Sequence, residues 1–210
     1  MMNKKGKFIV FEGLDGSGKG TQINLLVQQM QKDGRTVFQT AEPTFSSVGG
    51  IIRDALGGFQ KRDAYEMSAL FLTDRIFHNT NEKNGIKQFL DKGVDVVCDR
   101  YYYSSFAYQG IDANLEWVMK MNLECEEILK PDICIFLDVD TSLCDERIEK
   151  NRLEREIYEN KAVLEKIRKR FFDVFELLKD SENIKIVDAA RPVSEVSSDV
   201  IKIYNEIKEK

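Results

Sequence analysis

Short apolar runs alternate along this chain with longer segments in which apolar residues recur every three or four positions. The runs at 7–12, 36–40, 94–98, 133–138 and 184–187 have the length and composition of buried β-strands. The longer segments at 21–32, 64–79, 86–92, 142–151, 161–178 and 194–208 have the periodicity of helices. Because short apolar strands alternate with helices, we expect an α/β fold: a five-stranded parallel sheet flanked by helices on both faces.

The 210 residues suit one domain with a sizeable core. The chain has no internal repeat, Pro-rich linker or low-complexity segment that would mark a boundary. Residues 151–160 form a charged excursion between two predicted helices. We therefore expect a single domain over 1–210.

Charge and cysteine content restrict the partners and the compartment. The net charge of −5 argues against a general nucleic-acid partner, because phosphate backbones attract basic surfaces. No apolar run is long enough to cross a bilayer, and we expect neither a membrane partner nor a secretory signal. Cys98, Cys125, Cys134 and Cys144 form no C-x-x-C pair, and the single His78 offers no zinc partner. These features favour a cytoplasmic protein with reduced thiols.

The segment GLDGSGK at 13–19 carries nucleotide chemistry. It fits the G-x-x-x-x-G-K motif, follows a predicted strand and opens a predicted helix. Backbone N–H groups of such a loop surround phosphate oxygens, and Lys19 can reach the β- and γ-phosphates of ATP. The motif predicts a P-loop NTPase fold. The candidate ATP-binding residues here are Gly13, Asp15, Gly16, Ser17, Gly18, Lys19, Gly20 and Thr21.

Two features of this region narrow the class of protein. Gly20 stands where the motif usually has Ser or Thr, so the hydroxyl group that usually binds Mg²⁺ is missing at this position. Adenylate kinases have a similar G-K-G-T sequence. The guanine-reading N-K-x-D motif of switch GTPases is absent, because Asn160 and Lys161 are followed by Ala162 and Val163. A small kinase is favoured over a GTPase or a motor ATPase.

A second motif is more specific. DRYYYSSFAYQG at 99–110 resembles the D-R-Y-x-x-S-x-x-A-Y-Q-G signature of the thymidylate kinase family. The loop at 11–19, EPT at 42–44, DR at 74–75, KPD at 130–132 and YEN at 158–160 also resemble that family, in the same order along the chain. The resemblance implies transfer of the γ-phosphate of ATP to dTMP, with Mg²⁺ as cofactor and a homodimer as the assembly.

Several residues have a physical reason for these roles. Asp99 ends a predicted strand, where its carboxylate can hold Mg²⁺ through water, and Arg100 offers a planar set of donors for phosphate. A structural Asp99–Arg100 ion pair is the alternative. Phe71 and Arg75 lie four residues apart, hence on one helix face. The resemblance implies that Phe71 stacks on thymine and that Arg75 reaches its O4, while plain core packing is the alternative for Phe71.

Other candidates for the acceptor site come from the resemblance alone. Tyr108 matches a tyrosine that crowds the ribose 2′ position and so favours deoxyribose. The remaining matched positions for dTMP are Asp15, Arg100, Ser105, Gln109, Tyr158 and Glu159. For Tyr102 and Tyr103 packing is the simpler interpretation.

A lid is expected at about 147–160. The P-loop contains no arginine, and in the family a lid arginine then stabilises the transferred charge. The catalytic candidates are therefore Lys19, Asp99 and Arg100 together with Arg152 and Arg155. Arg147 is expected mainly to bind ATP. The alternative for this charged run is a solvated helix face.

One departure keeps other functions open. Ala41 precedes Glu42 and Pro43 where many relatives have arginine, so a basic contact is missing. We favour a dTMP kinase over a phosphotransferase for CMP, AMP or a deoxynucleoside, because the 99–110 signature is specific. A non-catalytic nucleotide-binding protein is disfavoured by the intact Lys19, Asp99 and Arg100.

Overall fold

The computed structural model describes residues 5–151 and 161–208. Its centre is a five-stranded sheet in the order β2-β3-β1-β4-β5, in which every neighbouring pair is parallel. The strands are β1 (Phe8–Gly13), β2 (Val37–Ala41), β3 (Asp95–Asp99), β4 (Ile133–Asp138) and β5 (Ile184–Asp188). The parallel sheet predicted from the apolar runs is confirmed, and each predicted strand lies within one residue of the observed one at either end.

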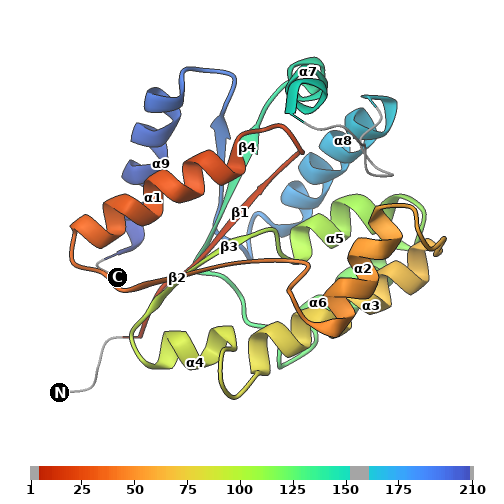
Figure 1. Ribbon diagram of the computed structural model, residues 1–210, viewed down its shortest axis with the longest axis horizontal. Coiled ribbons are helices and arrows are strands. Elements are labelled where there is room, and N and C mark those ends of the chain that lie inside the picture. Colours follow the sequence, from red (N-terminus) through yellow and green to blue (C-terminus); the bar gives the residue numbers. More distant parts are fainter. Residues whose placement is uncertain (1–4, 152–160, 209–210) are drawn as a thin grey trace.

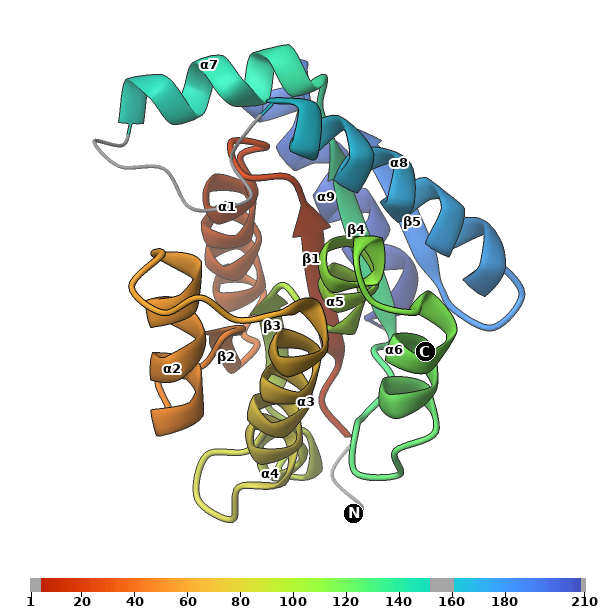
Figure 2. The ribbon, with the colours of Figure 1, turned by 90° about the vertical axis from the view of Figure 1, so that its right-hand side faces the viewer.

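Helices cover both faces of this sheet (Figure 1). Helices α1 (Lys19–Lys32) and α9 (Val193–Ile207) pack on one face. The opposite side carries α4 (Ile86–Asp91), α5 (Tyr102–Tyr108) and α8 (Lys161–Leu178). The remaining described helices are α2 (Ser47–Leu56), α3 (Ala64–Thr80), α6 (Leu115–Leu123), α7 (Thr141–Asn151) and a 3₁₀ turn at Gln109–Ile111. Figure 2 shows α3 between α2 and α6.

The helices α2, α5 and α6 are not evident from the pattern of apolar residues. Helix α2 contains two adjacent glycines, which are poor helix formers. Ser46 nevertheless caps it by accepting a hydrogen bond from the Gly49 N–H at 2.9 Å. A side chain at Gly49 would overlap the carbonyl of Thr44, so the close approach of this loop requires glycine. All seven residues of α5 are buried, so it has no polar face for a periodicity to detect.

The core is centred on β1, which is buried along its whole length. On one side of the sheet, Phe136 of β4 packs against Phe171 and Phe175 of α8, with ring centroids 4.9 and 5.0 Å away. Burial of these rings stabilises the packing of α8 against the sheet. Cys98, Cys134 and Cys144 are buried free thiols, and Cys125 is a partly buried one.

The carboxyl ends of the strands come together at one edge of the sheet. In the register, Asp99 of β3 lies beside Phe11 of β1 on one side and beside Ala41 of β2 on the other. The loops that follow β1, β2 and β3 therefore converge at this edge. In doubly wound sheets this is where ligands bind. Within the described residues, no helix combines the length and apolar character needed to span a bilayer.

Candidate active site

The loop between β1 and α1 has the backbone of a phosphate-binding loop. Gly16 and Gly18 have φ angles of 80° and 91°, in the left-handed region that favours glycine. A Cβ at Gly16 would also lie 2.6 Å from the carbonyl oxygen of Cys144. The loop leads directly into α1, so the free N–H groups of the first helical turn face the same space.

Lys19 is held inside this loop. Its side chain is 7% exposed, and Nζ donates to the carbonyl oxygens of Gly13 at 3.1 Å and Leu14 at 3.3 Å. Burial lowers the pKa of Lys19, and the nearby Arg100 lowers it further, while Asp99 and Asp15 oppose the shift. The ammonium group therefore lies beneath the loop. A phosphate bound by the loop would replace the two carbonyl oxygens as its partner.

A cavity of about 580 Å³ opens over the P-loop. It is lined by most of the predicted ATP-binding residues, namely Asp15, Gly16, Ser17, Gly18, Lys19, Gly20, Thr21 and Arg147. Arg147 reaches the loop from α7, with Nη1 3.1 Å from the carbonyl oxygen of Gly16. The far wall consists of Ala189 and Arg191, from the segment that joins β5 to α9, and of Val193 and Val196, from the first turn of α9. We call this space the P-loop cavity.

The sequence did not indicate that far wall. Its residues are small, apolar or surface-charged and match no motif, so only the return of the chain from β5 to α9 brings them to the P-loop.

A second cavity, of about 340 Å³, lies on the other side of Asp15 and Asp99. We call it the β3 cavity, because it opens beside the end of that strand. The predicted acceptor residues that line it are Asp15, Phe71, Arg75, Arg100, Ser105, Tyr108 and Gln109. It is also lined by Glu42, Phe45, Arg53, Leu56, Tyr101 and Ser104, which are not among the predicted acceptor residues.

The two cavities share three residues. Asp15, Lys19 and Asp99 line both of them. Nζ of Lys19 lies 4.0 Å from Oδ1 of Asp99. A group bound in one cavity can therefore reach a group bound in the other across a short, charged junction.

Arg100 sits at this junction in an unusual backbone conformation. Its φ of 67° is the one positive value at a non-glycine position among the described residues. This conformation costs about 1–3 kcal/mol at such a residue and is found mainly at functional sites. The guanidinium donates to Oδ1 of Asp15 at 2.8 Å and to Oγ of Ser104 at 3.0 Å, and it lies 5.1 Å from the ring centroid of Tyr108. The ion pair of Arg100 is thus with Asp15, whereas the sequence suggested Asp99 as its structural partner.

The buried guanidinium of Arg75 forms the floor of the β3 cavity. It is 1% exposed and donates to Glu42 at 2.8 Å, to Asn122 at 2.5 Å and to Ser105 at 3.1 Å. Glu42 is also 3.0 Å from Nδ1 of His78. These contacts fix the guanidinium plane, so any further hydrogen bond that Arg75 makes has a defined direction. Its contact with a base stays a prediction.

Phe71 and Gln109 face the same cavity with different properties. Phe71 packs at the edge of a small apolar cluster with Ile52, Ala55 and Met67, and one side of it remains partly exposed to the cavity. Gln109 is 2% exposed, and its Oε1 accepts no hydrogen bond within the described part of the chain. An unpaired buried acceptor is costly, so this oxygen is available for a ligand donor.

The tyrosines that follow Arg100 differ in their surroundings. The hydroxyl oxygen of Tyr101 lies 2.9 Å from Oδ1 of Asn79 and 3.0 Å from the carbonyl oxygen of Leu129, and its single proton serves these two acceptors. The hydroxyls of Tyr102 and Tyr103 donate to the two carboxylate oxygens of Glu182, at 3.1 and 2.9 Å. The packing interpretation of Tyr102 and Tyr103 is therefore supported.

Asp99 is the residue that fits a metal. Its Oδ1 is buried and accepts no hydrogen bond in the described residues. No group of three or more His, Cys, Asp or Glu side chains suited to a metal occurs in the same part of the chain. One carboxylate beside a phosphate-binding loop is a donor set typical of Mg²⁺, which keeps several waters and takes its other ligands from nucleotide phosphates. Arg152, Arg155, Tyr158 and Glu159 lie outside the described residues.

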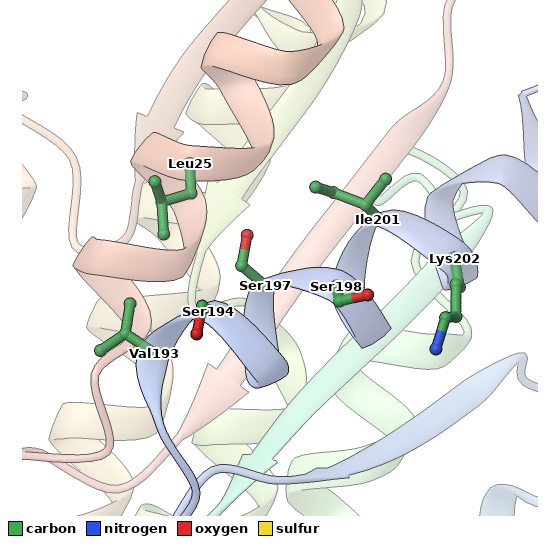
Figure 3. Close-up of a pocket in the computed structure, with 7 residues that line it drawn as sticks. All are labelled: Leu25, Val193, Ser194, Ser197, Ser198, Ile201 and Lys202. Carbon is green, nitrogen blue, oxygen red and sulfur yellow. The ribbon is translucent and has the colours of Figure 1, made fainter.

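A further hollow, of about 760 Å³, lies between α1 and α9 (Figure 3). Leu25 faces it from α1, and the remaining lining residues belong to α9: Val193, Ser194, Ser197, Ser198, Ile201 and Lys202. No predicted site residue lines it, and it touches the P-loop cavity only through Val193.

A parallel sheet with a P-loop after β1, and two cavities that meet at a lysine and an aspartate, defines a P-loop phosphotransferase for small substrates. The model of the thymidylate kinase family matches residues 11–200 of the chain. The chain belongs to the thymidylate kinase family. Thymidylate kinases phosphorylate dTMP to dTDP, and membership assigns the chain to that class of enzyme.

Individual relatives agree with this assignment. The chain is 38% identical over 198 residues to a probable thymidylate kinase of Methanocaldococcus jannaschii, covering 92% of this chain and 93% of the relative. It is 33% identical over 200 residues to a thymidylate kinase of Fervidobacterium nodosum, covering 94% and 98%. A solved thymidylate kinase structure from Candida albicans has the same fold, with a TM-score of 0.82 at 22% identity, covering 97% of this chain and 93% of that one.

Proposed function

We propose that this protein transfers the γ-phosphate of ATP to the phosphate of dTMP, with ATP in the P-loop cavity and dTMP in the β3 cavity. The observation that carries the proposal is that Asp15, Lys19 and Asp99 line both cavities. A donor and an acceptor bound there would meet at these three residues. Bringing the two substrates together in this way converts a bimolecular step into a nearly unimolecular one.

The base of dTMP would be recognised by stacking on its face and by hydrogen bonds to its polar edge. The exposed side of Phe71 offers a surface for stacking, as the family resemblance implies. The unpaired Oε1 of Gln109 is an acceptor for the single N–H of thymine, and Arg75, oriented by Glu42 and Ser105, is the donor for O4. Tyr108 would lie against the sugar and disfavour a 2′-hydroxyl.

The phosphate of dTMP would lie beside Arg100. The Asp15 carboxylate and the Ser104 hydroxyl hold its guanidinium at the mouth of the junction. Arg53 provides a second guanidinium on the same cavity wall, where Nη1 donates to the carbonyls of Pro43 and Thr44 at 3.1 and 2.7 Å. This second arginine compensates in part for Ala41, where many relatives have a basic residue.

ATP would bind with its phosphates along the P-loop and its base toward Arg147. Backbone N–H groups of the loop and of the first turn of α1 would hold the phosphates, and Lys19 would bridge the β- and γ-phosphates. Arg147 would lie against adenine through its planar guanidinium. Arg152 or Arg155 would stabilise the transferred charge from the lid, and Tyr158 and Glu159 would contact the acceptor sugar.

The reaction needs no general base. An oxygen of the dTMP phosphate, already ionised at neutral pH, forms the new bond to the γ-phosphorus. The bond from that phosphorus to the bridging oxygen of ADP breaks, and ADP leaves with the electron pair. Mg²⁺, held by Asp99 through water and by the nucleotide phosphates, would neutralise charge on the β- and γ-oxygens. Lys19 and Arg100 supply positive charge where negative charge develops.

The test is an assay of ADP release with ATP and a panel of nucleoside monophosphates. We expect the highest kcat/KM with dTMP. A kcat/KM for CMP or AMP equal to that for dTMP would refute the choice of acceptor. Failure of every acceptor to accelerate ADP release would favour the non-catalytic alternative. The panel includes dUMP, since the thymine methyl group alone distinguishes it from dTMP.

A homodimer in the cytoplasm completes the proposal. Large apolar side chains are exposed to solvent on two helices. On α3, Tyr65 is 48% exposed and Phe77 46%, and on α6, Trp117 is 39% exposed. Tyr65 and Trp117 lie together, with ring centroids 5.1 Å apart. A second copy covering them would remove this apolar area from water. Sedimentation equilibrium should give twice the chain mass, and a shift to the monomer on changing Tyr65 to Glu would locate the interface.

A further inference from the structure

A carboxylate is buried in the central strand beside the active site. Glu12 of β1 has 0% of its surface exposed and lines neither cavity. Its Oε1 accepts hydrogen bonds from the backbone N–H groups of Tyr101 at 2.9 Å and Ser104 at 3.1 Å. Its Oε2 accepts one from the Ser104 hydroxyl at 2.6 Å. Burial of a charge is costly unless it is hydrogen-bonded, and here every bond goes to one short segment.

That segment carries Arg100. The N–H of Tyr101 belongs to the peptide unit that begins at Arg100, whose φ is 67°. A hydrogen bond to this N–H fixes the direction of the peptide and so opposes relaxation of the left-handed conformation. The Ser104 hydroxyl donates to Glu12 and accepts from Nη1 of Arg100 at 3.0 Å. Glu12 thus contacts both the backbone that follows Arg100 and the group that orients its guanidinium.

We propose that Glu12 is a positioning residue for phosphoryl transfer, which fixes the left-handed backbone and the guanidinium of Arg100 so that the guanidinium meets the acceptor phosphate. The inference rests on the proposed function, because it takes Arg100 as the ligand of that phosphate. Glu12 acts only through Tyr101 and Ser104. A continuous chain of contacts then runs from Glu12 through Ser104 and Arg100 to Asp15.

The ionisation of Glu12 gives this role a signature. Burial raises the pKa of Glu12 to about 7, while the Arg100 guanidinium, the hydrogen bonds from Ser104 and Tyr101, and the Lys19 ammonium oppose the shift. The other titratable groups that sense its charge are the Tyr108 phenol and the Cys98 and Cys134 thiols, whose own pKa values burial raises. These three groups stay neutral near pH 7, so Arg100 and Lys19 are the ionised groups that act on Glu12.

Protonation would change one link of the chain. One oxygen can still accept the two backbone N–H groups, but the other becomes a donor to Ser104. The Ser104 hydroxyl then loses its charged acceptor, and a charge-assisted hydrogen bond is about twice as strong as a neutral one. Arg100 should be held less firmly as the pH falls through 7. Glutamine at position 12 has the same shape and the same neutral, part-donor character, so Glu12→Gln mimics the protonated state.

The experiment compares steady-state kinetics of the full chain and of Glu12→Gln between pH 6 and 9. At pH 8 we expect Glu12→Gln to raise KM for dTMP about tenfold, as for loss of one charge-assisted hydrogen bond, and to change KM for ATP by less than about threefold. As the pH falls through 7, the wild type should lose more affinity for dTMP than the variant does. The substrate phosphate ionises near pH 6 with both proteins, so the difference between the two profiles belongs to Glu12.

Glu182→Gln is the matched control. Glu182 accepts hydrogen bonds from Tyr102 and Tyr103 on the same helix, but it makes none with Arg100 or Ser104 in the described structure. The Glu182→Gln substitution should therefore leave the KM values for dTMP and ATP and the pH profile unchanged. Glu12→Ala removes all three hydrogen bonds and should raise KM for dTMP further than Glu12→Gln. If the alanine variant fails to fold, the glutamine variant still decides the question.

Three outcomes oppose the inference. A Glu12→Gln profile that coincides with the wild type overturns it. If Glu12→Gln raises KM equally for dTMP and ATP and lowers Tm, Glu12 has only a structural role. Arg100→Ala separates the two proposals: an unchanged KM for dTMP overturns the acceptor site itself, whereas an increase that Glu12→Gln does not share overturns only the role of Glu12.

Discussion

Nζ of Lys19 lies 4.0 Å from Oδ1 of Asp99, where the P-loop after β1 meets the carboxyl end of β3. The two residues are 80 positions apart in the sequence, and the parallel pairing of β1 with β3 brings them together. Lys19 is the proposed ligand of the ATP phosphates, and Asp99 is the proposed carboxylate for hydrated Mg²⁺, because its buried Oδ1 accepts no hydrogen bond in the described residues. Each has a separate experimental consequence.

Replacement of Lys19 by alanine should nearly abolish turnover. The ammonium group is expected to neutralise charge on the transferred phosphate, so we expect kcat to fall by about 10³-fold. Single-turnover kinetics measures this step directly. Lys169→Ala is the control, since that side chain is 80% exposed on α8, and circular dichroism should show both variants folded. A near-normal rate for Lys19→Ala would remove this lysine from the mechanism.

Replacement of Asp99 by asparagine should raise the Mg²⁺ concentration needed for half-maximal activity. Asparagine keeps the size of the side chain but removes the charge that attracts hydrated Mg²⁺. Activity of the wild type should disappear with excess chelator and return when Mg²⁺ is added. Full activity of the wild type in chelator would contradict the role of the metal. An unchanged Mg²⁺ titration for Asp99→Asn would contradict only the role of Asp99.

Replacement of Gln109 by leucine should weaken binding of dTMP. The change removes the buried Oε1 that is unpaired in the described structure and is expected to accept the thymine N–H. Loss of one hydrogen bond predicts an increase in KM for dTMP of about fivefold to tenfold, with KM for ATP unchanged. An N3-methylated dTMP tests the same contact from the substrate side. If the wild type and Gln109→Leu discriminate equally against the methylated substrate, Gln109 does not read this edge.

The arginines of the lid should separate into two kinetic classes. Arg147 contacts the P-loop carbonyl of Gly16, so Arg147→Ala should raise KM for ATP with a smaller effect on kcat. Arg152→Ala or Arg155→Ala should lower kcat by about 10³-fold, because a transition-state contact affects kcat more than KM. If both retain near-native kcat, the catalytic charge comes from elsewhere, and Arg147 is the first residue to examine.

Glu12 should make stability depend on pH with a definite sign. Its pKa is about 7 in the folded protein and about 4.5 in the unfolded chain, so the folded state binds the proton more tightly. The resulting stabilisation is complete below pH 4.5 and is lost as the pH rises through 7. Relative to Glu12→Gln, the wild-type free energy of unfolding should fall by on the order of 2 kcal/mol between pH 5 and 8. Denaturant titrations at both pH values measure this difference in the free energy of unfolding. A free energy that rises with pH would contradict a raised pKa of the buried Glu12 carboxyl.

Two helices, α2 and α5, could not be predicted from the pattern of apolar and polar residues. Helix α2 contains Gly49, which propensity disfavours, and it forms because the Thr44 loop packs directly on that glycine and Ser46 caps the first turn. Helix α5 is buried on all sides, so it has no polar face to give it a period. In both cases tertiary packing overrides a local signal.

The sequence by itself determined the five strands, the P-loop and the residues that end β3. These depend on local order: an apolar run, glycines at fixed positions, and a lysine at the start of a helix. The same local order placed Asp15, Lys19, Asp99 and Arg100 at the carboxyl edge of the sheet, because parallel strands present their ends together.

Only the tertiary structure decided the partners of these residues. Asp15 rather than Asp99 pairs with Arg100, Glu12 holds the backbone that follows it, and Arg53 joins the β3 cavity from α2. No spacing in the chain encodes such contacts, because residues from separate loops meet only after the sheet has brought those loops to one edge. The hydrogen bonds that orient the candidate site therefore follow from packing, whereas the groups that carry its chemistry follow from the motifs.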